Sequence, residues 1–274
     1  MSQTALADER VPVRDYTLDR SARVRANIKR YYIYVVLALI VLVFSLLKLD
    51  EVSFFGRGHF LSPDSVINLL RTAAPILTLS GAFTLLMISG YIDLSVGSAM
   101  SLSAVILAYM ILNGFSFVPA VAVTLVAGML MGTLNGFLVM KLRITPVIAT
   151  LVTLSLFKGL ALLIVPDGLS AIKSTAEKTM PAWINNYARQ DVLLGLPAAF
   201  YVAVLVIVVL VIVQRKTLLG KYAAAIGGNP TAAALSGINA VQVVWILYII
   251  VGLFAALAGV ALSLIHISEP TRPY

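Results

Sequence analysis

Residues 225–239 read Ala225-Ile-Gly-Gly-Asn-Pro-Thr-Ala-Ala-Ala-Leu-Ser-Gly-Ile-Asn239, a short polar segment set between two long apolar runs. Asn229 is a good helix N-cap, and Pro230 fits the first turn that follows it. Gly237 can end the helix in the left-handed conformation. A helix of about two turns is not stable alone in water. The segment therefore predicts a capped helix outside the bilayer that docks onto a soluble partner.

The composition indicates an integral membrane protein. The chain has 274 residues, of which 60% are hydrophobic and 12% are charged. Soluble domains carry roughly twice that charged fraction. Strand alternation is absent, so we expect an all-α polytopic transmembrane helical bundle of about seven spans. The net charge of +8 is explained by cytoplasmic loops and an arm facing lipid headgroups, without nucleic acid. Cys is absent, which excludes disulfides and thiol chemistry.

The apolar runs define three regions: a cytoplasmic arm over residues 1–30, a transmembrane domain over 31–262, and a tail over 263–274. The expected spans are residues 31–47, 66–90, 96–112, 117–140, 146–165, 198–213 and 241–262. If the basic arm is cytoplasmic, so are the connections after the second, fourth and sixth spans. The last two of these carry Lys141, Arg143, Arg215, Lys216 and Lys221. This agrees with the enrichment of Lys and Arg on the cytoplasmic side and places residues 227–239 there.

A second polar interruption, residues 88–98, separates the second and third spans. It contains Gly90, Asp93, Ser95 and Ser98. Asp93 or Ser95 can cap the following helix. Broken helices in transporters also line pathways, so Asp93 is a pathway candidate as well, with the structural cap as the favoured interpretation. Either way, a carboxylate at membrane depth must be paired or hydrated.

Small residues indicate close helix packing in two spans. Gly128 and Gly132 form a small-xxx-small face, and Asn135 lies near it. Ala255 and Gly259 form a similar face in the seventh span. Asn135 has two interpretations, a packing residue or a hydrogen-bonding group that faces the translocation path.

No catalytic constellation is present in the sequence. His59 and His266 stand alone, and no zinc-protease, nucleophile-elbow or nucleotide-phosphate motif occurs. We therefore expect no catalytic residues, no metal and no cofactor. Lys158 falls inside the fifth span, where it can reach water with its long stem, form an ion pair or line a pathway. If transport is driven by ATP, another chain must hold the nucleotide.

Three segments resemble permease subunits of bacterial ABC importers for monosaccharides of the ribose, xylose, arabinose and galactose type. Residues 89–98, SGYIDLSVGS, resemble the family signature SGGIDLSVGS. Residues 135–136, NG, and 145–152, TPVIATLV, are similar to its next segment. Residues 219–221, LGK, and 225–239, AIGGNPTAAALSGIN, resemble its cytoplasmic segment.

The resemblance implies a permease that works by alternating access, with a coupling helix inserted into a separate ATP-binding subunit. It further implies a second permease subunit and an extracytoplasmic sugar-binding protein, in a bacterial inner membrane with the N-terminus cytoplasmic. The coupling residues it implies are Gly227, Gly228, Asn229, Pro230, Ala232, Ala233, Ser236 and Gly237. The pathway residues are Asp93, Ser95 and Ser98, to which we add Asn135. The sparse charge inside the spans suits a neutral pentose or hexose.

The chain departs from the family at its end. The family continues with further helices, whereas residues 263–274, SLIHISEPTRPY, do not resemble it. We expect this tail to be a sequencing-adapter remnant on a truncated gene. Three other interpretations stay open: an ion-coupled secondary transporter, a membrane-embedded enzyme, and a non-functional fragment.

Overall fold

The structure is a computed structural model that describes residues 31–43, 63–165, 191–193 and 195–268. The chain divides into two compact units, Met1–Ser65 and Val66–Tyr274. The first unit contains an apolar helix, Tyr31–Val43, within the first predicted span. The arm over residues 1–30, His59, most of the loop before residue 198 and the tail beyond residue 268 lie outside the described residues.

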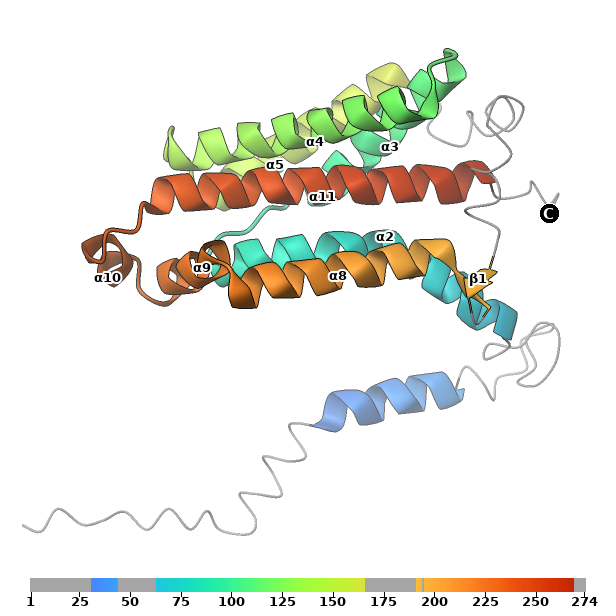
Figure 1. Cartoon of the computed structure of the whole chain (residues 1–274), viewed down its shortest axis with the longest axis horizontal. Coiled ribbons are helices and arrows are strands. Elements are labelled where there is room, and N and C mark those ends of the chain that lie inside the picture. Colours follow the sequence, from blue (N-terminus) through green and yellow to red (C-terminus); the bar gives the residue numbers. More distant parts are fainter. Residues whose placement is uncertain (1–30, 44–62, 166–190, 194, 269–274) are drawn as a thin grey trace, which may run out of the picture. The chain divides into compact units, whose positions relative to one another are not determined.

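The described part of the second unit is built almost entirely of helices, the first of which begins three residues before its boundary (Figure 1). They are α2 (Pro63–Ile88), α3 (Val96–Leu112), α4 (Phe117–Met140), α5 (Pro146–Ile164), α8 (Ala198–Lys216), α9 (Leu218–Gly228), α10 (Pro230–Leu235) and α11 (Ala240–Ser268). A small antiparallel pair, β1 (Asp191–Leu193) and β2 (Leu196–Pro197), precedes α8. Five described helices, α2, α4, α5, α8 and α11, are long and apolar enough to cross a membrane. The all-α, polytopic prediction is confirmed.

Several helix ends differ from the predicted spans, among them both ends of α2, which was predicted over 66–90 and is Pro63–Ile88, and one described helix was not predicted. Helix α8 continues three residues beyond the predicted end and therefore includes Arg215 and Lys216 in its last turn. Helix α11 continues past residue 262 to Ser268. Residues 218–228, predicted as part of a polar connection, form α9. That helix buries Gly220, Ala223 and Ile226 at a spacing of three, which is an amphipathic face too short to stand out in the sequence.

Helix α11 packs against α4 through glycines on both helices. A Cβ at Gly128 would lie 2.5 Å from the carbonyl oxygen of Gly252, and one at Gly132 would overlap the carbonyl group of Tyr248. On a neighbouring face of α11, a Cβ at Gly259 would lie 2.5 Å from the carbonyl oxygen of Met100 in α3. The backbone of α11 thus approaches those of α4 and α3 as closely as glycine allows, and the packing predicted for the small-residue faces is confirmed.

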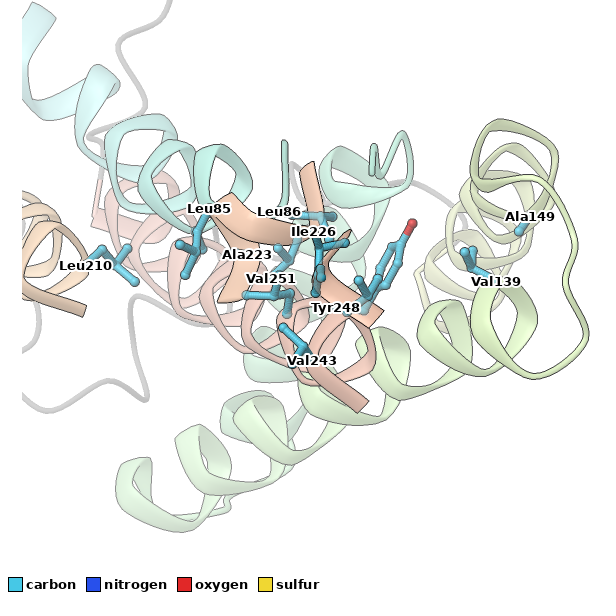
Figure 2. Close-up of a cluster of buried hydrophobic side chains, with 14 residues drawn as sticks. Leu85, Leu86, Val139, Ala149, Leu210, Ala223, Ile226, Val243, Tyr248 and Val251 are labelled. Carbon is cyan, nitrogen blue, oxygen red and sulfur yellow. The ribbon is translucent and has the colours of Figure 1, made fainter. Parts of the chain in front are cut away.

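One buried apolar cluster joins helices from several parts of this unit (Figure 2). It combines Leu85 and Leu86 of α2, Ile226 of α9, and Val244 and Tyr248 of α11. Val139 of α4 and Ala149 of α5 belong to the same cluster. Because these residues come from the end of α2, the end of α4 and the start of α11, the cluster lies at the end of the bundle that carries α9 and α10 (Figure 1).

Candidate functional site

Helix α10 has the capped form that the sequence predicts. The side-chain Oδ1 of Asn229 accepts a hydrogen bond from the backbone N–H of Ala232 at 3.0 Å. Pro230 occupies the first helical turn, where a missing N–H costs nothing. At the other end Gly237 adopts φ +81°, and the N–H of the next residue, Ile238, donates to the carbonyl oxygen of Ala233 at 3.1 Å. Both ends of this two-turn helix are therefore held by local hydrogen bonds.

Most of α10 is exposed. Ala233 is buried and attaches the helix to the rest of the unit, whereas Ala232 and Ser236 face outward. Leu235 is 86% exposed. Sequence reasoning assigned no role to Leu235, although a single large apolar side chain among alanines was a usable signal. The result is a small capped helix that carries one large exposed apolar side chain.

Gly227 and Gly228, at the end of α9, have different surroundings. A Cβ at Gly227 would overlap the carbonyl oxygen of Ile88, the last residue of α2, and would lie 3.2 Å from the carbonyl carbon of Ser89. A Cβ at Gly228 would meet no atom within 4 Å. The sequence predicted one role for both glycines. The structure separates them: Gly227 permits α9 to rest on the end of α2, and Gly228 is open to its surroundings.

The connection between α2 and α3 contains a buried polar cluster of Asp93, Ser95 and Asn135. The carboxylate Oδ1 of Asp93 accepts hydrogen bonds from the backbone N–H of Ser95 at 2.8 Å and from its hydroxyl at 2.7 Å. Asn135 of α4 donates from Nδ2 to the other carboxylate oxygen at 3.0 Å and to the Ser95 hydroxyl at 2.7 Å. All three side chains are at most 3% exposed. Three of the four predicted pathway residues thus form one network.

The fourth predicted pathway residue, Ser98, is not part of that network. Its hydroxyl donates to the backbone carbonyl oxygen of Ser95 at 2.8 Å. Ser95 occupies the N-cap position of α3, but its side chain makes no capping bond. Instead Asp93 forms an Asx turn onto the Ser95 N–H. Of the two predicted capping residues, Asp93 therefore orders the start of α3.

The polar cluster lies at a narrow cleft. The lining residues are Asp93, Ser95, Val96, Ala99, Met131, Gly132, Asn135, Val251, Gly252 and Ala255. This space does not admit a sphere the size of a water molecule, so no sugar fits there in this arrangement. Burial raises the pKa of Asp93, and the hydrogen bonds from Ser95 and Asn135 lower it in part. In this conformation the cluster joins the α2–α3 connection to α4.

Tyr248 is a site residue that sequence reasoning missed. This buried side chain of α11 donates from its hydroxyl to the carbonyl oxygen of Ile92 at 3.1 Å. The connection of residues 89–95 is thereby held by α4 through Asn135 and by α11 through Tyr248. A lone Tyr in an apolar run gave no pattern from which this contact could be found.

The remaining candidates lie apart from this site. Lys158 of α5 is exposed. Among the residues that the structure describes, no group of three or more His, Cys, Asp or Glu side chains could hold a metal ion. The side chain of His266 lies outside the described set.

Residues 65–271 match a family model described as the branched-chain amino acid transport system / permease component. The match extends past residue 263, where the unrelated tail was predicted to begin. The chain is 35% identical over 217 residues to the ribose import permease protein RbsC of Bacillus subtilis (strain 168), covering 77% of this chain and 64% of that protein.

The names of two further relatives give other sugars. The galactofuranose transporter permease protein YtfT of Escherichia coli (strain K12) is 35% identical over 199 residues, covering 73% of this chain and 56% of that protein. The fructose import permease protein FruF of Bifidobacterium longum (strain NCC 2705) is 30% identical over 194 residues, with 71% and 53% covered. The chain thus spans between about half and two thirds of the length of these relatives. No solved structure gives a significant match.

Proposed function

Because the chain belongs to the family described as the branched-chain amino acid transport system / permease component, we propose that it is the membrane-spanning subunit of an ATP-driven importer of a monosaccharide. The observation that carries the proposal is the exposed, doubly capped helix α10, attached through α9 to the α2–α3 connection. A separate ATP-binding subunit would receive α10. The resemblance to importer permeases agrees with the names of the relatives, which include ribose, galactofuranose and fructose permeases.

The coupling proposal follows from how α10 is attached. A two-turn helix does not hold its own shape, yet here Asn229 and Gly237 fix its two ends. Helix α9, which precedes α10, buries one face against other helices and lies against the end of α2 at Gly227. A partner that grips α10 would therefore move α9 and α10 together. In this scheme Gly228, Ala232, Ser236 and the exposed Leu235 make the contact surface.

The substrate class is proposed from chemistry and from the relatives together. A neutral sugar needs hydroxyl and amide partners and few charges. Ser95, Ser98 and Asn135 are groups of that kind, and Asp93 adds a single carboxylate that can accept hydrogen bonds from sugar hydroxyls. The cluster is closed here, so these residues would meet a sugar only in another state of the alternating cycle. A second permease subunit and an extracytoplasmic sugar-binding protein would complete the importer.

The orientation is proposed from charge. The exposed cations at the ends of α4 and α8 lie at the same end of the bundle as α10 (Figure 1). Lys and Arg are enriched on the cytoplasmic side of bacterial membrane proteins. This arrangement supports a cytoplasmic α10 in the inner membrane. A cytoplasmic N-terminus follows if residues 31–47 form one further span before α2.

The experiment is sugar uptake by proteoliposomes that contain the permease with and without its ATP-binding subunit. We expect uptake that requires both the subunit and ATP. Replacing Gly228 by Arg fills open space, so the protein should insert and fold normally while ATP hydrolysis no longer drives uptake. Gly228→Ala is the matched control and should transport normally. Uptake without any ATP-binding subunit would instead favour an ion-coupled transporter, and normal uptake by Gly228→Arg would remove α10 from the coupling contact.

A further inference from the structure

Five exposed cations surround the end of the bundle that carries α9 and α10. This basic patch consists of Lys141, Arg143, Arg215, Lys216 and Lys221. Two of them follow α4, two lie in the last turn of α8, and one lies in the first turn of α9. Among the side chains that the structure describes, the acidic one is Asp93, which is buried. The patch therefore has no acidic side chain of the described chain to neutralise it.

The cations of the patch come from two parts of the chain and lie at the same end of this unit. Met140 and Ile144, which flank the first two cations, pack against the same buried cluster as Leu219 and Tyr222, which flank Lys221. Helices α8 and α9 are joined by a tight turn, since a Cβ at Gly220 would lie 2.5 Å from the Cα of Gln214. Figure 1 shows the end of α4 and the turn between α8 and α9 at the same end of this unit.

Arg143 stands at a position where glycine would be less strained. Its φ is +56°, the one positive value for a non-glycine residue among those the structure describes. The N–H of the next residue, Ile144, donates to the carbonyl oxygen of Leu138 near the end of α4 at 3.1 Å, so the turn is closed by a backbone hydrogen bond. A side chain in this conformation is sterically disfavoured. The Arg143 side chain is exposed in this turn, two residues from the exposed Lys141.

Trp245 lies beside the first cation of the patch, Lys141. The ring is half-buried near the start of α11, and its Nε1–H donates to the carbonyl oxygen of Thr133 at 3.2 Å. Lys141 Nζ lies 5.9 Å from the ring centroid. Tryptophan beside basic side chains at the end of spanning helices is typical of the membrane interface, and Arg binds phosphate oxygens in a bidentate manner.

We propose that Lys141, Arg143 and Trp245, within the basic patch, form a binding site for the headgroup of an anionic phospholipid. The site requires that the helices span a membrane. It does not depend on the sugar or on the coupling role of α10.

The test uses Trp245 as the reporter. The chain has two Trp residues, so Trp183→Phe leaves Trp245 as the single tryptophan, whose emission is measured. This protein is reconstituted in mixed phosphatidylglycerol and phosphatidylcholine vesicles, with bromine on the acyl chains of one lipid or the other. Quenching by each brominated lipid gives the relative binding of the two headgroups beside Trp245. We expect phosphatidylglycerol to be favoured about five-fold for each cation that contributes, and less so at high salt.

Two substitutions locate the site, and a third controls for charge. Arg143→Gly removes the guanidinium while keeping the left-handed turn, so folding is retained, and Lys141→Gln removes the neighbouring charge. Together they should bring the preference down at least five-fold, whereas Lys158→Gln on α5 should leave it unchanged. Equal quenching by both lipids, or an unchanged preference in the double variant, would overturn the proposal. A different result would assign the patch to the ATP-binding subunit instead. In that case both lipids quench equally, adding the subunit changes the emission of Trp245, and the double variant abolishes this change.

Discussion

Gly227→Ala tests whether α9 transmits motion by direct contact with α2. The added methyl group would overlap the carbonyl oxygen of Ile88, a backbone atom that cannot rotate away. Restoring normal contact requires α9 to move by on the order of 1 Å, and overpacking of this kind costs about 1–3 kcal/mol. Replacing glycine by alanine in a helix offsets up to about 1 kcal/mol of that. We therefore expect a net loss of about 1–2 kcal/mol, together with a displaced α10.

The matched control is Gly228→Ala, one residue further on. No atom lies within 4 Å of the position of its Cβ, so the overpacking cost is absent. The assay measures denaturant unfolding in detergent micelles for both variants, and then ATP-driven uptake per unit of ATP hydrolysed in proteoliposomes. We expect Gly227→Ala to be less stable and less well coupled than Gly228→Ala. Equal stability and equal coupling of the two variants would refute the contact between α9 and the end of α2.

Three other substitutions test separate contacts. Gly132→Ala places a methyl group against the backbone of α11 and should lower the free energy of unfolding in the same micelles by about 3 kcal/mol. Gly159→Ala on α5, where no atom lies within 4 Å of the added Cβ, should not lower it. Asn135→Ala removes two donors from the polar cluster and leaves Asp93 less well satisfied, which should cost about 1–3 kcal/mol in that assay. Asn229→Ala should cost about 1 kcal/mol within α10 alone, so hydrogen exchange there should rise and uptake should fall while global unfolding is unchanged.

The sequence predicted the helices where apolar runs are bounded by polar or helix-ending residues. The bounds of α3 and α4 agree with the predicted residues 96–112 and 117–140. Helix α10 was predictable because its capping interactions are local, within three to five residues of Asn229 and Gly237. Helix α9 was missed because its stability comes from burying one face against other helices, which a sequence window does not contain.

The site was predictable in its residue types but not in its contacts. Asp93, Ser95 and Asn135 were each chosen, yet nothing in the sequence states that Asn135, 42 residues from Asp93, donates to its carboxylate. The different surroundings of Gly227 and Gly228 depend on where α2 ends in space. Two adjacent glycines look alike in a sequence, and only tertiary packing distinguishes them.

The connection of residues 89–95 links the helices around it, and this explains how a small movement of α10 could reach the rest of the unit. Helix α9 rests on its first residues at Gly227, and α4 holds Asp93 through Asn135. Since protein interiors are close-packed, a shift at one contact is passed to the other unless the connection deforms. α4 and α11 are locked together by their glycines, so they would follow as one body.

Because both contacts act on the same connection, Gly227→Ala and Asn135→Ala should not be independent. Residues linked through one backbone segment show interaction energies of about 0.5–3 kcal/mol, whereas independent sites add within about 0.5 kcal/mol. A double-mutant cycle on unfolding and on coupled uptake measures the difference. Gly228→Ala replaces Gly227→Ala in a second cycle as the control and should give simple additivity. If both cycles are additive, the α2–α3 connection does not join α9 to α4, and motion of α10 must reach the membrane helices by another route.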